Sequence, residues 1–273
     1  MASVQYLLYP EWQGYGVDAS VTHGALAVAR SLFPDAAFAC IESPVDEALT
    51  VSGGVLGLTS IAERFRSTLA TLRATAPDVV VTVGGTCGVE AAPVAYLNEH
   101  YDGDLAVVWF DAHGDLNAPA TSPSGHFHGM VLRTPLGEGP LEYVGELRRP
   151  LRPAQLFLAG TRDLDPEESA YIRRAEISVT PPEAFVDPLA IATAIRARGF
   201  RNVYLHLDMD CFRPDEFPDT LMRTPGGPTP ASVAAMLAEL RAAFHVAGFS
   251  LLEYVDRGGD SLGTLRDTVS ILL

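Results

Sequence analysis

The sequence contains little cysteine and lacks an excess of positive charge. Its 273 residues include three cysteines, at positions 40, 87 and 211, which are odd in number and widely spaced. This pattern forms no disulfide framework and is typical of a reducing compartment, so we expect a cytoplasmic protein. With 34 acidic residues against 19 Lys and Arg, the net charge is −15. Such a charge argues against a nucleic-acid partner, whose phosphates need the opposite sign, and it favours attraction of a small cation.

Long apolar runs are also missing. No stretch is long and apolar enough to span a bilayer, and the first residues lack a basic region followed by an apolar one. We therefore expect no membrane segment and no secretory signal. No linker rich in Pro, Gly and Ser divides the chain, and we find no internal repeat. The length fits one large core, so residues 1–273 are predicted to form a single domain.

Short apolar runs alternate with segments of helical pattern along the chain. The strands that we expect lie at residues 4–9, 36–41, 78–83, 106–110, 155–159, 177–179, 203–207 and 248–252. The helices that we expect lie at about residues 18–33, 60–75 and 88–100, just after 124, up to about 174, and at 187–199, 229–245 and from 260 onward. This alternation predicts an α/β protein with a parallel sheet covered by helices on both faces.

The most informative segment is the apolar run at residues 106–110, which leads directly into Asp111, His113 and Asp115. An unbroken apolar run predicts a strand buried on both faces, and ligands gather at the carboxyl ends of such strands. Side chains at alternating positions can project towards one point. Taken alone, this cluster is compatible with a metal site and with a solvated turn rich in aspartate.

Similar side chains follow other predicted strands. They are Cys87 after the Gly84-Gly85 turn, Asp208 and Asp210, and Glu253, and His128 adds a second imidazole. Carboxylates and imidazoles at this density favour Mn²⁺ or Mg²⁺ over a structural zinc. Burying four aspartates without cations would carry a large desolvation cost. Two divalent ions bridged by carboxylates would remove that cost and would lower the pKa of a shared water for hydrolysis.

Five segments resemble, in the same order, the signatures of the arginase/ureohydrolase family. They are Val-Gly-Gly-Thr-Cys-Gly from residue 83, Asp-Ala-His-Gly-Asp-Leu-Asn from 111, Ser-Gly-His-Phe-His-Gly-Met from 124, Gly-Thr-Arg-Asp-Leu-Asp-Pro from 160 and Leu-Asp-Met-Asp from 207. The resemblance covers roughly residues 80–253. It implies a three-layer α/β/α fold with a mostly parallel eight-stranded sheet. It also implies two Mn²⁺ per chain and hydrolysis of a guanidino group.

The resemblance assigns metal ligands and catalytic groups. Asp111 and Asp208 would bridge the two metals, Asp115 would complete one site, and the other would contain the pair formed by His113 and Asp210. Among the catalytic groups, Glu253 would pair with the substrate guanidinium and His128 would protonate the departing amine.

It also assigns contacts with the amino-acid end of a small guanidino substrate. Asn117 and Ser124 match positions that hold this end, and Asp165 matches one that binds the α-amino group. A second ring of residues would act through water: Ser122, His126 and Glu168.

Cys87 occupies a position where typical members of the family have a metal-binding histidine. Three interpretations are possible: a site that has lost one metal, a small apolar cysteine beside an intact site, or a thiolate ligand, which we favour. A thiolate with four aspartates would bring five negative charges against four positive ones, so the metals would be weaker Lewis acids. An N-hydroxylated guanidine suits such a centre better than an ordinary one. The change resembles the branch of the family that hydrolyses N-omega-hydroxy-L-arginine to hydroxyurea and L-ornithine in D-cycloserine biosynthesis.

Several alternatives stay open on the sequence. L-Arginine, agmatine or guanidinobutyrate are alternative substrates, and an inactive ligand-binding homologue is the alternative to an enzyme. His206 is expected to be a buried core histidine rather than a ligand, and Cys40 and Cys211 to be inert core residues. The segment 214–225 is longer and poorer in glycine than its equivalent in the family. The chain lacks the C-terminal extension that holds some members in trimers, so we expect a monomer, with other subunit contacts left open.

Overall fold

The computed structural model describes residues 2–273 and contains one large sheet. Its strands are β1 (Val4–Tyr9), β2 (Phe38–Cys40), β5 (Val79–Gly84), β6 (Ala106–Phe110), β7 (Leu156–Ala159), β8 (Ser178–Thr180), β9 (Asn202–Asp208) and β10 (His245–Leu252). They lie in the order β2-β1-β5-β10-β9-β6-β7-β8, and all neighbours are parallel. The sequence expectation of eight parallel strands is confirmed. A separate hairpin joins β3 (Val51–Ser52) to β4 (Val55–Leu56).

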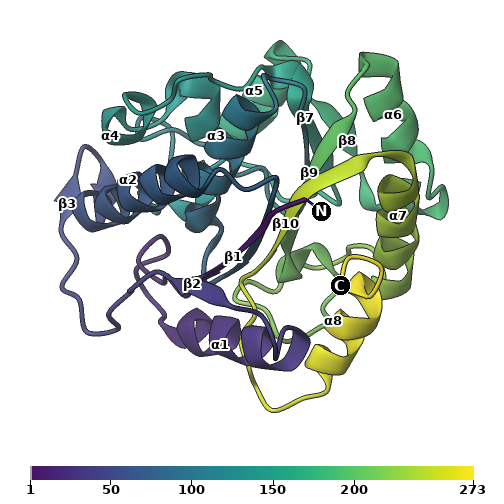
Figure 1. The fold of residues 1–273 in the computed structure, drawn as a ribbon, viewed down its shortest axis with the longest axis horizontal. Coiled ribbons are helices and arrows are strands. Elements are labelled where there is room, and N and C mark those ends of the chain that lie inside the picture. Colours follow the sequence, from purple (N-terminus) through teal and green to yellow (C-terminus); the bar gives the residue numbers. More distant parts are fainter. Residues whose placement is uncertain (1) are drawn as a thin grey trace.

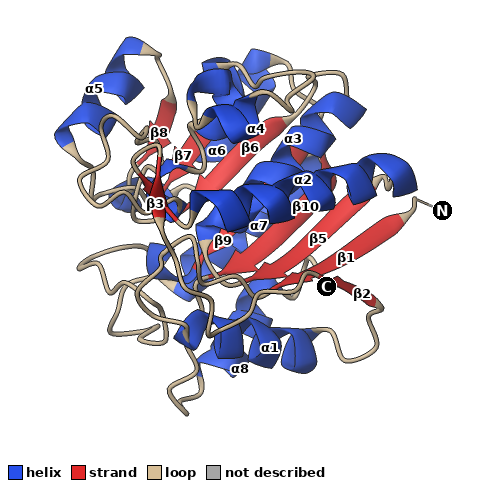
Figure 2. Cartoon of the chain, turned by 90° about the vertical axis from the view of Figure 1, so that its left-hand side faces the viewer, coloured by secondary structure: helices blue, strands red, loops and turns tan. Residues whose placement is uncertain are grey.

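Helices cover both faces of this sheet, which confirms the three-layer α/β/α fold (Figures 1 and 2). One layer contains α2 (Leu58–Thr75), α3 (Ala91–His100), α4 (Leu141–Val144) and α5 (Pro166–Arg174). The other layer contains α1 (Ser20–Leu32), α6 (Ala190–Arg198), α7 (Pro230–Ala243) and α8 (Ser261–Val269). Each layer buries its apolar side chains against one face of the sheet.

Strand β6 shows why its sequence is apolar throughout. Val107 and Trp109 join the core under α2 and α3, whereas Val108 and Phe110 join the core on the opposite face. Successive side chains of a strand point to opposite faces, so a strand covered on both sides needs apolar residues at every position.

Several boundaries differ from the sequence expectations. Helix α2 begins at Leu58 after Gly57, whose φ of +69° is left-handed, so the expected start at Ser60 is wrong. Helix α7 ends at residue 243, and β10 starts at residue 245, inside the helix that the sequence predicted. No long helix starts near residue 124 among the described residues. Instead, a short 3-10 turn is formed by His128–Met130.

The cysteine expectations are confirmed in part. Cys211 is buried, as expected, but Cys40 is exposed at the end of edge strand β2, so its assignment to the core was wrong. All three cysteines, including Cys87, are free. In residues 2–273 we also find no helix with the length and apolar character needed to cross a membrane.

Candidate metal centre and active site

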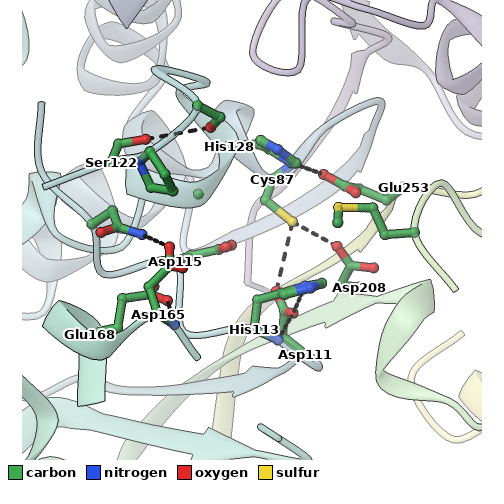
Figure 3. Close-up of a pocket in the computed structure, with 15 residues that line it drawn as sticks. Cys87, Asp111, His113, Asp115, Ser122, His128, Asp165, Glu168, Asp208 and Glu253 are labelled. Atoms are coloured by element: carbon green, nitrogen blue, oxygen red, sulfur yellow. Dashed lines mark hydrogen bonds and ion pairs between the residues drawn. The ribbon is translucent and has the colours of Figure 1, made fainter. Parts of the chain in front are cut away.

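The candidate site lies where the four central strands end. Strands β5, β10, β9 and β6 are neighbours in the sheet, and the predicted site residues follow each of them. Parallel strands all end at the same edge, so Cys87, Asp111, Asp208 and Glu253 come together although 166 residues separate the first from the last. They line one pocket with His113, Asp115 and His128 (Figure 3).

Cys87 is the first residue of a short 3-10 helix, Cys87–Glu90, which follows the Gly84-Gly85 turn. Its buried thiol donates to Asp208 Oδ2 at 2.9 Å and lies 4.0 Å from Asp111 Oδ2. Burial and the negative charge of Asp208 raise the pKa of this thiol well above its usual value. The structure therefore places the sulfur among the carboxylates, as a ligand requires, rather than apart from them in an apolar environment.

His113 connects two of the aspartates. Its Nδ1 lies 3.0 Å from Asp210 Oδ2 and 3.4 Å from Asp111 Oδ1. Backbone amides also hold carboxylates of this centre: His113 N donates to Asp111 Oδ1 at 2.6 Å, and Asp210 N donates to Asp208 Oδ1 at 2.7 Å. The order Asp-X-His and Asp-X-Asp at a strand end allows this, because the first carboxylate accepts from the amide two residues later.

The aspartates do not share one electrostatic state. Burial and nearby acids raise the pKa of Asp208 and Asp115 well above the usual range, and raise that of Asp210 to about 6. Burial acts in the same direction on Asp111, but hydrogen bonds from His113 and His206 hold its pKa below the usual value. So many carboxylates at one point repel each other unless protons or cations lie between them.

Two site carboxylates lie on left-handed backbone. The φ angle is +50° at Asp115 and +59° at Glu253, where L-residues pay a steric cost. Asp115 Oδ2 is buried and has no hydrogen-bond partner in residues 2–273. Glu253 Oε1 accepts from the Cys87 amide at 3.2 Å and lies 3.0 Å from His128 Nδ1. Strained, incompletely satisfied acids in a pocket are typical of a functional site.

The groups assigned to the far end of the substrate also line the pocket, but they have structural partners. Asn117 Nδ2 donates to Asp165 Oδ2 at 2.8 Å, and Asp165 is the N-cap of α5. Glu168 accepts from the Leu116 amide at 2.8 Å and from the Asp165 amide at 3.0 Å. These bonds hold the loop after Asp115 against α5.

In the loop that contains Ser122, Ser124 and His126, the two serines line the pocket and the histidine does not. Both serines line the pocket, and Ser122 Oγ accepts from the Gly125 amide at 3.0 Å. Among residues 2–273, the pocket lining does not include His126, whose ring packs edge-on against Tyr15 with centroids 5.3 Å apart. The structure thus places His126 beside the pocket lining, and its expected role through water stays a prediction.

Sequence reasoning assigned His206 to the core, and the structure gives it a second property. The ring is fully buried and stacks on Trp109 with centroids 3.4 Å apart, as a core residue would. However, its Nε2 lies 3.5 Å from Cys87 Sγ and 3.6 Å from Asp111 Oδ2. The signal for this contact was available, since His206 precedes Asp208 by two residues and shares its face of the strand.

Sequence reasoning also missed Arg162. Its guanidinium donates to six backbone carbonyls, those of Gly160, Asp210, Cys211, Phe212, Thr224 and Pro225. These bonds fix the segment that follows β9, including the unusual residues 214–225, of which Met222 reaches the pocket. Arg162 thereby holds the turn that contains Asp210 in place, and it does not line the pocket itself.

The arrangement brings at least three groups of potential ligand atoms within 4.8 Å of one another. The groups are Cys87 with Asp111, His206 and Asp208; Asp111 with His113 and Asp210; and Asp208 with Asp210 and Glu253. Asp111, Asp208 and Asp210 each occur in two groups, so the three groups share carboxylates and lie side by side. Asp115 lines the same pocket but does not fall within these groups.

Comparison with known proteins agrees with this geometry. The Arginase family model matches residues 38–256 of the chain. Staphylococcus aureus arginase from strain MRSA252 is 36% identical over 180 residues, which are 63% of this chain and 59% of that protein. Bacillus subtilis arginase is 34% identical over 154 residues, covering 54% of this chain and 51% of that protein. The matched segments thus span half to three-fifths of these curated relatives.

Solved structures show the same fold over nearly the whole chain. Entamoeba histolytica arginase, crystallised in complex with L-ornithine, superposes with a TM-score of 0.89 at 20% identity, covering 98% of this chain and 97% of that one. Proclavaminate amidino hydrolase from Streptomyces clavuligerus superposes with a TM-score of 0.75 at 23% identity, covering 99% and 91%.

Proposed function

This chain belongs to the arginase family, and we propose that it is a hydrolase that cleaves the guanidino group of a small amino acid at a binuclear metal centre. The observation that carries the proposal is the convergence of Cys87, His113 and four aspartates at the ends of β5, β6 and β9. Figure 3 labels all of them except Asp210. We propose further that residues 1–273 act as one catalytic domain. Because all three cysteines are free, we place it in the cytoplasm.

The donor set fits two divalent cations. The ligands that we propose are Cys87, Asp111, Asp115 and Asp208 for one cation, and Asp111, His113, Asp208 and Asp210 for the other. The raised pKa values of Asp115, Asp208 and Asp210 and the unpartnered Asp115 Oδ2 describe a centre short of positive charge. Oxygen-rich sites with one imidazole favour Mn²⁺. When bound, such cations supply Lewis acidity that lowers the pKa of water at the centre.

Residues of the chain bind and orient the substrate around this centre. The Glu253 carboxylate is held through Oε1 by the Cys87 amide and His128, so Oε2 is the oxygen that we assign to a guanidinium N–H. His128 contacts Glu253 through Nδ1, which directs Nε2 towards the departing amine as its proton donor. The edge-on Tyr15 ring, with its centroid 5.2 Å from that of His128, limits rotation of the imidazole.

The substrate that we favour is N-omega-hydroxy-L-arginine, giving hydroxyurea and L-ornithine. The support is Cys87: one thiolate and four aspartates carry five negative charges against the four of two divalent cations, which weakens attack on an unmodified guanidinium. An electron-withdrawing hydroxyl group makes the guanidine carbon easier to attack. This chemistry would be a step in the biosynthesis of an antibiotic such as D-cycloserine.

L-Arginine is the second candidate, because the curated relatives are named arginases and one solved neighbour was crystallised with L-ornithine. The contacts at Asn117 and Asp165 suit either amino acid, since the two substrates differ only at the guanidine end.

The test is a steady-state assay of the Mn²⁺-loaded protein with both substrates, measuring L-ornithine together with urea or hydroxyurea. We expect a higher kcat/KM for the hydroxylated substrate. A Glu253→Gln variant keeps the shape but loses the charge, so it should lose activity on both substrates, whereas Glu142→Gln, at an exposed position of α4, should change neither. Equal or faster hydrolysis of L-arginine would refute the hydroxyarginine assignment, and no hydrolysis of either by a metal-loaded protein would favour an inactive homologue.

A further inference from the structure

The most unusual feature outside the predicted ligand set is a buried polar chain behind Cys87. It consists of His206 on β9, Glu90 at the end of the 3-10 turn that Cys87 begins, and Ser250 on β10. The side chains of His206 and Glu90 are both fully buried. A buried acid and a buried imidazole carry a large desolvation cost. We therefore ask what function these three polar side chains serve.

Strand register aims His206 at the centre. His206 lies opposite Trp109 on β6 and opposite Ser250 on β10. Because side chains repeat every two residues, His206 lies on the same face as Asp208, and Trp109 on the same face as Asp111. The stack of the imidazole on the Trp109 indole, with only 1° between the ring planes, fixes the direction of its nitrogens.

The ring nitrogens face two different environments. Nε2 lies 3.5 Å from Cys87 Sγ and 3.6 Å from Asp111 Oδ2, and Cys87 Sγ lies 2.9 Å from Asp208 Oδ2. Donor atoms bound to one cation at about 2.0–2.3 Å lie about 3–4 Å from one another, and the separations of Nε2 from Cys87 Sγ and Asp111 Oδ2, 3.5 and 3.6 Å, match this spacing. Nδ1 lies 3.5 Å from Glu90 Oε2, and that oxygen accepts from Ser250 Oγ at 2.9 Å.

We infer that His206 is a metal ligand of the site containing Cys87, binding through Nε2, and that Glu90 is its positioning residue. This inference rests on the proposed function and adds to its ligand set. Histidine ligands commonly donate their second ring N–H to a carboxylate, which sets the tautomer and the orientation of the ring. A neutral imidazole also adds a donor to Cys87 and its aspartates without adding negative charge. In this arrangement β9 supplies the imidazole next to Cys87 Sγ.

The test uses the apoprotein loaded with Co²⁺, and reads binding rather than turnover. A histidine that binds Co²⁺ through one ring nitrogen keeps a proton on the other, which gives a strongly shifted proton resonance that ¹⁵N-histidine labelling identifies. We expect two such resonances in the wild type, from His113 and His206, with the second slow to exchange because it is buried. His206→Gln should remove it and weaken Co²⁺ binding at one of two sites.

Two further variants separate ligation from packing. Glu90→Gln should keep both resonances but weaken Co²⁺ binding about 10- to 100-fold, as loss of a ligand's supporting carboxylate commonly does. His23→Gln, at an exposed position of α1, should change neither. A wild type that binds two Co²⁺ with one imidazole resonance would overturn the inference and leave the proposed function standing. A wild type that binds no cation would overturn the proposed function and the inference with it. If His206→Gln does not fold, the number of imidazole resonances in the wild type and the Co²⁺ affinity of Glu90→Gln still test whether His206 is a ligand.

Discussion

Replacing Glu11 by glutamine should change how the stability of this protein depends on pH. Glu11 is buried beside the turn that leads to Cys87, and its Oε1 accepts from the Gly14 amide at 2.9 Å and the Thr86 hydroxyl at 3.3 Å. Its backbone carbonyl accepts from the Thr86 amide at 2.9 Å. Burial raises the pKa of Glu11 from 4.5 to about 7, against the opposing attraction of Arg64.

The direction of the effect follows from proton binding. Between pH 4.5 and about 7 the folded protein keeps the Glu11 proton that the unfolded chain releases. The free energy of unfolding therefore falls as pH rises through this window and is constant above it. The difference of about 2.5 pH units, at about 1.4 kcal/mol per unit, corresponds to a loss of about 3 kcal/mol. Glutamine keeps an acceptor for Gly14 and Thr86 but cannot ionise, so the variant lacks this loss.

The assay is urea unfolding of wild-type and Glu11→Gln apoprotein at pH 4.5 and pH 8.5. The difference in unfolding free energy between the two proteins should increase by about 3 kcal/mol in favour of the variant at the higher pH. Glu47→Gln is the control. Hydrogen bonds from Arg64 and other side chains lower the pKa of Glu47 against the effect of burial, so its contribution to stability is lost only as pH falls below about 4.5. Its difference from the wild type should therefore change little between pH 4.5 and pH 8.5. A difference for Glu11→Gln that does not change with pH would refute this account of its burial.

Three further substitutions test the site and its support. Cys87→His should retain two cations. On the charge argument, the kcat/KM for L-arginine divided by that for N-omega-hydroxy-L-arginine should rise about tenfold, which corresponds to about 1.4 kcal/mol of barrier. If assays of urea and hydroxyurea release give an unchanged preference, pocket shape selects the substrate. Arg162→Lys cannot reach six carbonyls, so we expect a loss of about 2 kcal/mol in unfolding free energy and faster hydrogen exchange in residues 210–225, and normal protection there would contradict the clamp. Gly85→Ala would place a Cβ 2.0 Å from the Glu11 carbonyl oxygen and should cost about 3 kcal/mol or more in urea unfolding, whereas Gly129→Ala, with nothing within 4 Å, should cost little.

The sheet and the position of the site could be predicted because they depend on local pattern. The apolar run of β6 requires a strand buried on both faces, and parallel strands that each end in an acid must bring those acids to one edge. Asp111 and Asp208 could therefore be placed together, although 97 residues separate them in the sequence. Helix boundaries depend on finer features. Ser60 and Glu63 match a capping box, but the left-handed Gly57 starts α2 earlier because it turns the chain before Ser60 is reached.

The contacts of Arg162 could not be predicted for a different reason. Each of its bonds goes to a backbone carbonyl, from Gly160 to Pro225, and carbonyl positions carry no signature in the sequence. The same holds for the left-handed backbone at Asp115 and Glu253, since aspartate adopts a positive φ only occasionally and glutamate gives no sign of one. Both features lie in segments that follow the strand ends, where the backbone must leave the direction of the strand to bring the carboxylates to the pocket.

The burial of His206 could be predicted from the sequence, but its contacts with Cys87 and Glu90 could not. A histidine inside an apolar strand is usually a core residue, and this one is buried and stacked on Trp109 as that argument expects. Its neighbours across the sheet decide whether it does more, and they come from β6 and β10, far away in the sequence. Position 87 carries a sulfur, and Glu90, three residues later, supplies a carboxylate to the far side of the imidazole. Cys87 stands out in the sequence alone, but its connection to His206 and Glu90 becomes visible only when the register of β6, β9 and β10 is known, and the sequence pattern does not give that register.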